Sequence, residues 1–279
     1  MKSLKIYFII VGMLTLGCTP PLQTTTQKLI ETKECTGCDL REAKLNYSQL
    51  AGANLNRADL ANAEMSNTNL AGAQLKSADL FNANLSNANL ESALLTNAFL
   101  TGTNLSAVNL KQANLEEASL RSANLENAIL VGAQLGYANL SNSQLNSADL
   151  SNAALSNAIL NNANLSKANL KNATLTDSIL RQADLTEANL EAVFLENANL
   201  MRANLESANL STTNLRYANL VEANLKKANL RGADLSNANL TGANLEEADL
   251  TDATLTGTIL PPSASAAPDE NDSEYIDNL

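Results

Sequence analysis

The sequence contains no tryptophan and no histidine, and aromatic residues make up only 3% of its 279 residues. Without histidine the chain cannot build a Ser-His-Asp or Cys-His nucleophile, an imidazole general base or a histidine-containing zinc site. Hydrophobic residues still reach 45% and are mostly Leu and Ala. A core of interlocking large side chains is therefore not expected, and a repetitive structure must bury these residues instead.

Positive charge is also scarce, because 18 Lys and Arg residues stand against 29 Asp and Glu residues. A protein that binds nucleic acid directly needs a clustered excess of Lys and Arg, and the sequence contains no such cluster. The composition therefore disfavours direct nucleic-acid binding.

The N-terminus has the pattern of a secretory signal. Lys2 and Lys5 precede an apolar run, residues 6–16, which is too short for a comfortable membrane span. We therefore expect a signal peptide over residues 1–17, an exported protein, and a tether over residues 18–26.

The end of this segment, Leu-Thr-Leu-Gly-Cys, resembles a bacterial lipobox, in which the cysteine is diacylated. It departs from the usual pattern because Thr15 stands where Leu is commonest and Leu16 stands where a smaller residue is usual. The resemblance implies lipidation of Cys18, with the protein held by its N-terminal lipid on a membrane and facing the periplasm or cell surface. An ordinary cleaved signal and an uncleaved N-terminal anchor are the alternatives.

The main feature of the sequence is a period of five. Every fifth position from Leu40 to Leu260 is Leu, except Met65, which gives 45 consecutive pentads without an insertion. Two residues earlier the chain has Ala in 35 of the 45 pentads and otherwise a residue no larger than Val. Neither an α-helix nor a flat strand puts such a set on one face, whereas a square coil of four pentads points both residues inward.

Segments such as Ala53-Asn54-Leu55 and Ala163-Asn164-Leu165 resemble the A(N/D)LXX motif of the pentapeptide-repeat family. The resemblance implies an all-β fold over residues 38–260, a right-handed quadrilateral parallel β-helix of about 11 coils and roughly 54 Å in length. Asn and Asp before each central Leu are expected to cap backbone groups at the corners, with a polar ladder that binds water, ice or sugar as the alternative.

The two ends of the repeat have their own signals. Residues 27–37 are expected to cap the N-terminal end, with a short helix at residues 27–33. Cys35 and Cys38 are expected to form a disulfide, with free thiols or redox chemistry as alternatives. Residues 261–279 begin with two prolines and carry five acidic residues, so this tail is expected to be disordered, with an electrostatic binding role as the alternative.

Some pentads replace the usual Asn with an apolar residue, and others have an apolar residue just after the central Leu. A period of twenty puts several of these on one face, as a candidate partner-binding stripe: Phe81, Phe99, Ile159, Ile179, Met201 and Val221. The alternative is tolerated surface substitution, because Leu94, Ile129 and Phe194 fall on other faces.

These features favour a non-enzymatic protein without cofactor or metal. The expected function is an extracytoplasmic, membrane-tethered rod that binds another protein or acts as a scaffold, and an end-to-end homodimer is a further expectation. The alternative comes from the family resemblance, since some members are acidic rods that imitate DNA and inhibit gyrase. An enzyme would need a pocket with converging ionisable groups, and the unbroken repeat offers no inserted loop to form one.

Overall fold

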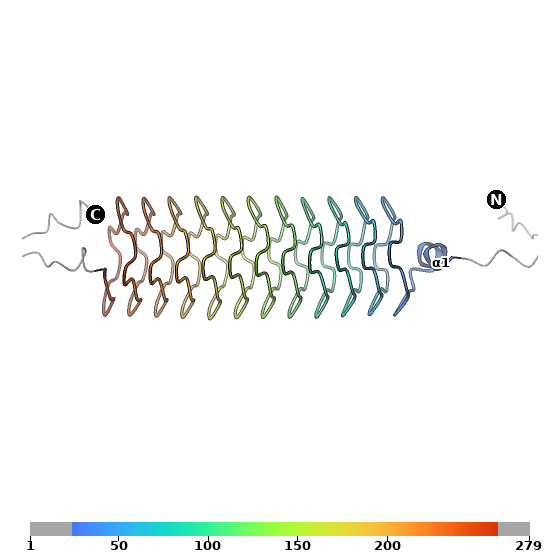
Figure 1. The fold of residues 1–279 in the computed structure, drawn as a ribbon, viewed down its shortest axis with the longest axis horizontal. Coiled ribbons are helices and arrows are strands. Elements are labelled where there is room, and N and C mark those ends of the chain that lie inside the picture. Colours follow the sequence, from blue (N-terminus) through green and yellow to red (C-terminus); the bar gives the residue numbers. More distant parts are fainter. Residues whose placement is uncertain (1–23, 262–279) are drawn as a thin grey trace, which may run out of the picture.

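The computed structural model describes residues 24–261, which form one long rod with a short helix at its N-terminal end (Figure 1). The expected signal peptide, the lipidation of Cys18, most of the tether and the acidic tail lie outside the described residues. The rod is the predicted right-handed quadrilateral parallel β-helix.

The coils are joined by a parallel ladder with a register of twenty residues. The residue before each central Leu pairs with the equivalent residue of the next coil, from Glu34 with Asn54 to Asn239 with Ile259. Each pentad contributes one such ladder residue, and no longer strand occurs within residues 24–261. The ladder begins at Glu34, so the β-helix includes the end of the segment expected to be a separate cap.

Each pentad also contains a turn that makes a corner of the coil. At one of the first corners, the Ala43 N–H donates to the Leu40 carbonyl oxygen over 3.0 Å. Glu42, between them, has φ of 56°. A left-handed residue recurs at this place in nearly every pentad and is often Asn, which tolerates that conformation better than most side chains.

The interior is built from the two inward positions that the repeat predicts in each pentad, one occupied by a large residue and the other by a small one. The central Leu residues and the Ala residues two positions earlier are buried along the rod, and Leu165, near its middle, is fully buried. Five Ser or Thr residues replace Ala and are also buried. Their hydroxyls donate to backbone carbonyls, as Thr68 does to Leu45 over 2.7 Å. No buried side-chain polar atom in the described rod is left without a hydrogen bond.

Asn and Asp before the central Leu residues cap the corners, as predicted. Asn164 is representative, because its Oδ1 accepts the Ser166 N–H over 3.0 Å. Its Nδ2 donates to Gln144 Oε1 of the preceding coil over 3.2 Å. The same side chain therefore holds its own corner and links two coils.

Helix α1 spans Thr25–Thr32 and covers the N-terminal end of the rod (Figure 1). It begins two residues before the predicted start because Thr24 forms a capping box. Thr24 Oγ1 accepts the Gln27 N–H over 3.2 Å, and Gln27 Oε1 accepts the Thr24 N–H over 3.0 Å. Leu29 of α1 is fully buried against the first coil, so the helix shields the end of the core.

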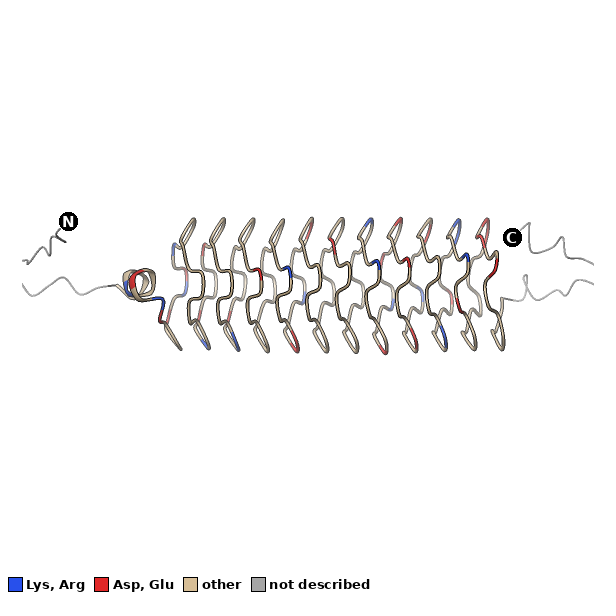
Figure 2. Cartoon of the chain, turned by 180° about the vertical axis from the view of Figure 1, so that it is seen from behind, with Lys and Arg blue, Asp and Glu red and all other residues tan. Residues whose placement is uncertain are grey.

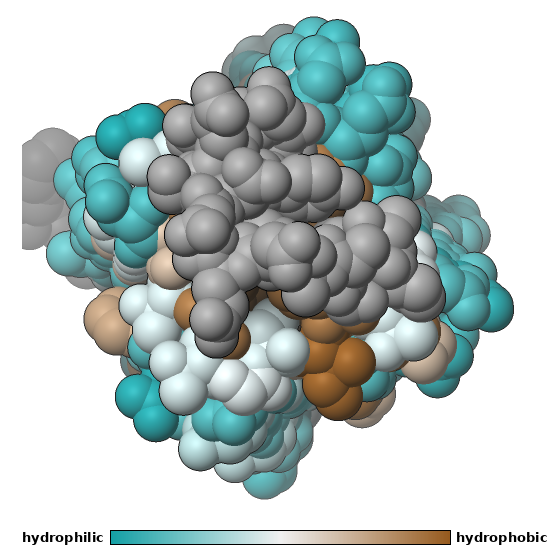
Figure 3. Space-filling view, turned by 90° about the vertical axis from the view of Figure 1, so that its left-hand side faces the viewer, coloured by the Kyte–Doolittle hydropathy of each residue, from teal (hydrophilic) through white to brown (hydrophobic). Residues whose placement is uncertain are grey.

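The C-terminal end is less well covered by the described residues. Leu255 and Ala253 are only partly buried, and Ile259 is 55% exposed. Apolar surface is visible at this end between the polar corners (Figure 3). The two ends of the described rod therefore differ in how far their leucine layers are shielded.

Candidate functional site

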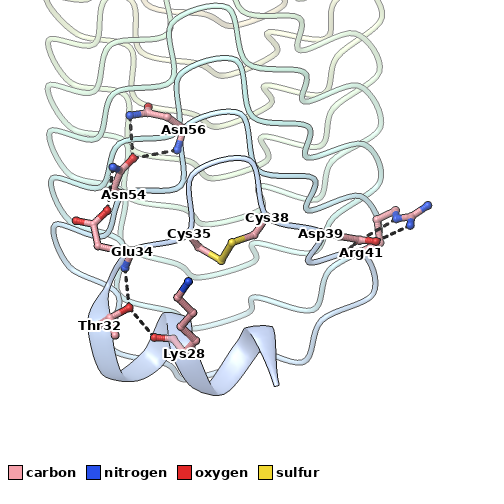
Figure 4. Close-up of a disulfide and its surroundings, with 9 residues drawn as sticks. All are labelled: Lys28, Thr32, Glu34, Cys35, Cys38, Asp39, Arg41, Asn54 and Asn56. Atoms are coloured by element: carbon pink, nitrogen blue, oxygen red, sulfur yellow. Dashed lines mark hydrogen bonds and ion pairs between the residues drawn. A yellow bond between two sulfur atoms is a disulfide. The ribbon is translucent and has the colours of Figure 1, made fainter. Parts of the chain in front are cut away.

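The first coil is fastened by a disulfide beside α1 (Figure 4). Cys35 and Cys38 have their Cα atoms 5.2 Å apart and their sulfur atoms bonded. Cys35 is buried, and its carbonyl oxygen accepts the Cys38 N–H over 3.3 Å. The disulfide thus spans the first turn of the ladder, on the side that faces the helix (Figure 4).

Hydrogen bonds connect α1 to the same coil. Thr32 Oγ1 donates to the Lys28 carbonyl over 2.8 Å and accepts the Glu34 N–H over 3.2 Å. Lys33, the left-handed residue that ends α1, donates through Nζ to the Gln49 carbonyl oxygen. The side chain of Lys33 therefore satisfies a carbonyl that has no preceding coil to bond.

The six residues of the predicted stripe lie on one side of the rod. Ile159, Ile179 and Phe99 belong to a single ladder column, in which residue 99 connects to residue 159 through Ser119 and Asn139. Phe81, Met201 and Val221 lie just beyond the central Leu residues of the same side. We call this side the Ile159 face.

The stripe consists of three separate pairs and is not continuous. Phe81 and Phe99 are 45% and 55% exposed. Ile159 and Ile179 are half-buried neighbours in the ladder. Met201 and Val221 are half-buried on successive coils. Polar residues separate the pairs, so the apolar surface is divided along the Ile159 face.

Most ion pairs among the described residues lie in the C-terminal half of the rod. Figure 2 marks the positions of the charged residues along the chain. Lys226 Nζ lies 2.8 Å from Glu246 Oε2, and the Lys227–Glu247 pair is 3.7 Å apart. Both pairs join residues twenty positions apart, as the period predicts. Five other basic residues have an acid on the next coil toward the C-terminus: Lys167, Lys171, Arg202, Arg216 and Arg231.

These contacts shift the titration of several exposed groups. A hydrogen bond from Arg202 lowers the pKa of Glu222, and a hydrogen bond to Glu246 raises the pKa of Lys226. Near the N-terminal end, the Arg41 guanidinium holds the pKa of Asp39 at about 2 through a side-chain hydrogen bond. All of these groups face solvent, so each pair contributes little stability.

Two shallow hollows interrupt the regular surface. The larger, of about 500 Å³, includes Asn56, Arg57 and Lys76 in its lining. The smaller, of about 200 Å³, includes Asn161 and Arg181. Neither hollow is predicted by the repeat pattern of the sequence. The available signal was an Asn just after a central Leu, followed twenty residues later by a cation.

The described residues contain no group of three or more His, Cys, Asp and Glu side chains that could hold a metal ion. Among residues 24–261 there is also no helix long and apolar enough to span a membrane. The predicted lipidation site, Cys18, falls outside this range.

Comparison with protein families gives matches along the whole repeat. The model described as pentapeptide repeats (8 copies) matches residues 34–72, 73–112, 109–146 and 218–257. The model described as a pentapeptide repeat region matches residues 148–225. No curated protein matches the chain.

Solved structures of similar proteins include HetL, a pentapeptide repeat protein involved in heterocyst differentiation regulation in the cyanobacterium Nostoc sp. strain PCC 7120. It is 34% identical to this chain, with 81% of this chain and 91% of HetL covered and a TM-score of 0.39. A pentapeptide repeat protein of the Arabidopsis thaliana thylakoid lumen is 35% identical, with 33% of this chain and 64% of that chain covered and a TM-score of 0.32. QnrB1, a plasmid-mediated fluoroquinolone resistance protein, is 20% identical, with 59% and 84% covered and a TM-score of 0.44. Because the family models match most of residues 34–257, this chain belongs to the pentapeptide-repeat family.

Proposed function

We propose that this protein is a non-enzymatic rod that binds another protein through its Ile159 face and is held at a membrane outside the cytoplasm. The observation that carries the binding proposal is the set of three apolar pairs on that face. Asn at the ladder position caps a corner, and an apolar residue at that position gives up this hydrogen bond. Covering exposed apolar side chains at these ladder positions with a partner removes apolar surface from water, which favours binding.

The corner at Ile179 illustrates this loss. Ile179 has no side-chain oxygen for the Arg181 N–H, which donates instead to Asn161 Oδ1 of the preceding coil over 3.2 Å. The Arg181 N–H thus keeps a hydrogen-bond acceptor although Ile179 cannot provide one. A corner capped by Asn would not need this substitute.

The test replaces Ile159 and Ile179 together with Asn, the residue at equivalent positions 139 and 199 of the same column. In the cells that produce the protein, chemical cross-linking followed by mass spectrometry should recover a partner with the wild type and lose it with the double variant. The control changes Leu94 and Phe194 to Asn, because both belong to a ladder column on another face. Equal recovery from all three proteins would refute binding through the Ile159 face.

The location outside the cytoplasm rests on the N-terminal sequence alone. A basic start, a short apolar run and the lipobox-like residues before Cys18 favour export and diacylation, and two acyl chains suffice for stable anchoring. The partner would then be a protein of the envelope or cell surface. An end-to-end homodimer through the less shielded C-terminal coil is the corresponding proposal for self-association.

Inhibition of gyrase through DNA mimicry is the second candidate, favoured by the excess of acidic residues in the rod. The ion pairs of residues 167–231 oppose it, because they alternate the two signs where DNA would present negative charge only. A supercoiling assay with protein lacking residues 1–17 separates the candidates. Inhibition at micromolar concentration would support DNA mimicry against the protein-binding proposal.

A further inference from the structure

The larger hollow lies on a different side of the rod from the Ile159 face. Its ladder column runs from Glu34 through Asn54, Gln74 and Leu94, and we call this side the Lys76 face. The hollow is open and extends over successive coils, from Asn56 through Lys76 to Thr96. At about 4.8 Å per coil, these residues span roughly 10 Å along the rod.

The local cause of the hollow is a displaced corner cap. Gln74 stands where Asn or Asp usually caps the residue two positions later. The Lys76 N–H donates instead to Asn56 Oδ1 over 2.9 Å. Asn56 Nδ2 donates to Asn54 Oδ1 over 2.9 Å and to Gln74 Oε1 over 3.1 Å (Figure 4 shows the Asn54–Asn56 contact). Asn56 is therefore drawn along the surface by three hydrogen bonds and does not project from it.

The smaller hollow repeats this construction on the Ile159 face. Ile179 replaces the usual cap, and Asn161 bonds the backbone of Arg181 across the coils. In both places the residue whose N–H is capped from the preceding coil is a cation. The same cross-coil cap occurs a third time, where Asn46 Oδ1 accepts the Ser66 N–H over 2.8 Å, so the capped residue is a cation at two of its three occurrences among the described residues.

The larger hollow holds two cations without a counter-charge. Arg57 and Lys76 have no carboxylate oxygen within 4.0 Å among residues 24–261, in contrast with the paired cations of residues 167–231. The two are neighbours on successive coils, because the Arg57 N–H donates to the Lys76 carbonyl over 2.9 Å. No acidic side chain lines the hollow. It is therefore a local positive site on a rod of net negative charge.

From this geometry we propose that the hollow binds an extended saccharide that carries carboxylates. The Arg57 guanidinium and the Lys76 ammonium lie on different coils, which suits two separate single charges on one chain. Ser77, Thr96 and Asn97 supply hydroxyl and amide groups for the sugar hydroxyls, and no aromatic or aliphatic residue lines the hollow. The apolar part of the lining comes only from the methyl and methylene groups of these Thr, Lys and Arg side chains, which can lie against the faces of sugar rings.

An acidic peptide fits the site less well. A peptide gains affinity on a β-surface by pairing its backbone with a free edge. The backbone here is already used, since the Ser77 N–H donates to the Thr96 carbonyl over 3.0 Å and the Lys76 N–H is capped by Asn56. Only side chains remain to recognise the ligand, which suits a hydroxyl-rich chain.

Isothermal titration calorimetry at low ionic strength tests the proposal, with trigalacturonate as the carboxylated saccharide. Maltotriose is the neutral saccharide and triglutamate is the acidic peptide. Trigalacturonate should bind more tightly than either of these ligands. The double variant Arg57→Gln and Lys76→Gln should weaken its binding at least tenfold.

The matched control is the double variant Lys44→Gln and Lys111→Gln, which removes the same charge from two cations outside the hollow. Its affinity for trigalacturonate should stay within twofold of the wild type. Equal weakening by both variants would show a net-charge effect and overturn the site. Tighter binding of triglutamate, or no binding of trigalacturonate at millimolar concentration, would overturn the ligand class. None of these outcomes involves the Ile159 face, so this proposal and the proposed function fail independently.

Discussion

Replacing Leu165 with Ala should show how strongly the rod depends on its stacked leucines. Leu165 is fully buried in the middle of the rod. The change removes three carbons, which at about 0.8 kcal/mol for each buried CH₂ costs roughly 2.4 kcal/mol in transfer free energy. The cavity adds to this because each Leu is held between coils that are fixed by the ladder. The total loss of unfolding free energy should therefore fall at about 3–4 kcal/mol, within the usual range of roughly 2–5 kcal/mol.

The matched control is Leu255→Ala in the last coil. Leu255 has the same place in its pentad but is only partly buried and has no complete coil beyond it among the described residues. Its loss should be less than half of that at Leu165. The assay is urea denaturation followed by far-UV circular dichroism, with the denaturant slope compared between variants. A loss below about 1 kcal/mol at Leu165, or equal losses at both positions, would refute the stacked-core reasoning.

Three other predictions follow from single residues. Ala192→Gly should raise the unfolding free energy by about 0.5–1 kcal/mol in urea denaturation, because Ala192 has φ of 57°, whereas Gly102→Ala should lower it. Unfolding curves between pH 4 and pH 2 should show the Asp39 contribution present above its ordinary pKa of 3.8 and lost as pH falls through about 2. In Arg41→Gln, carboxyl NMR should find the Asp39 pKa raised toward its ordinary value but still below it, because the backbone N–H of residue 41 continues to donate to Asp39 Oδ1. Cys18→Ala should move the protein out of the membrane fraction and abolish incorporation of labelled fatty acid, and retention in that fraction would favour an uncleaved anchor.

The fold could be predicted from the repeat because its two inward positions recur without a break. Leu at every fifth position and a small residue two places earlier leave one way to bury both sets, and the structure has that geometry. The corner caps were predictable for the same reason, since Asn and Asp recur at one place in the pentad. The Lys226–Glu246 ion pair follows from the period of twenty, because residues twenty positions apart lie on adjacent coils.

The ends and the hollows were harder to predict because they depend on departures from the repeat. The start of α1 depends on the capping box at Thr24, where Thr stands among several similar residues. The ladder begins at Glu34, where the surrounding sequence does not match the pentad motif. At the hollow beside Lys76, Asn56 of the preceding coil caps the Lys76 N–H in place of Gln74. The pentad pattern alone does not show which neighbouring side chain supplies a cap that is missing.

The proposed Ile159 face is tested most directly by moving one photo-cross-linking amino acid around a single coil. Residues 159, 164, 169 and 174 hold the same place in four successive pentads and belong to four different ladder columns. The same probe at each position samples the four sides of the rod at one height. Irradiation of living cells should capture a protein partner from position 159 at several times the yield from the other three. Equal capture from all four, or preferred capture from positions 164, 169 or 174, would contradict binding through the Ile159 face.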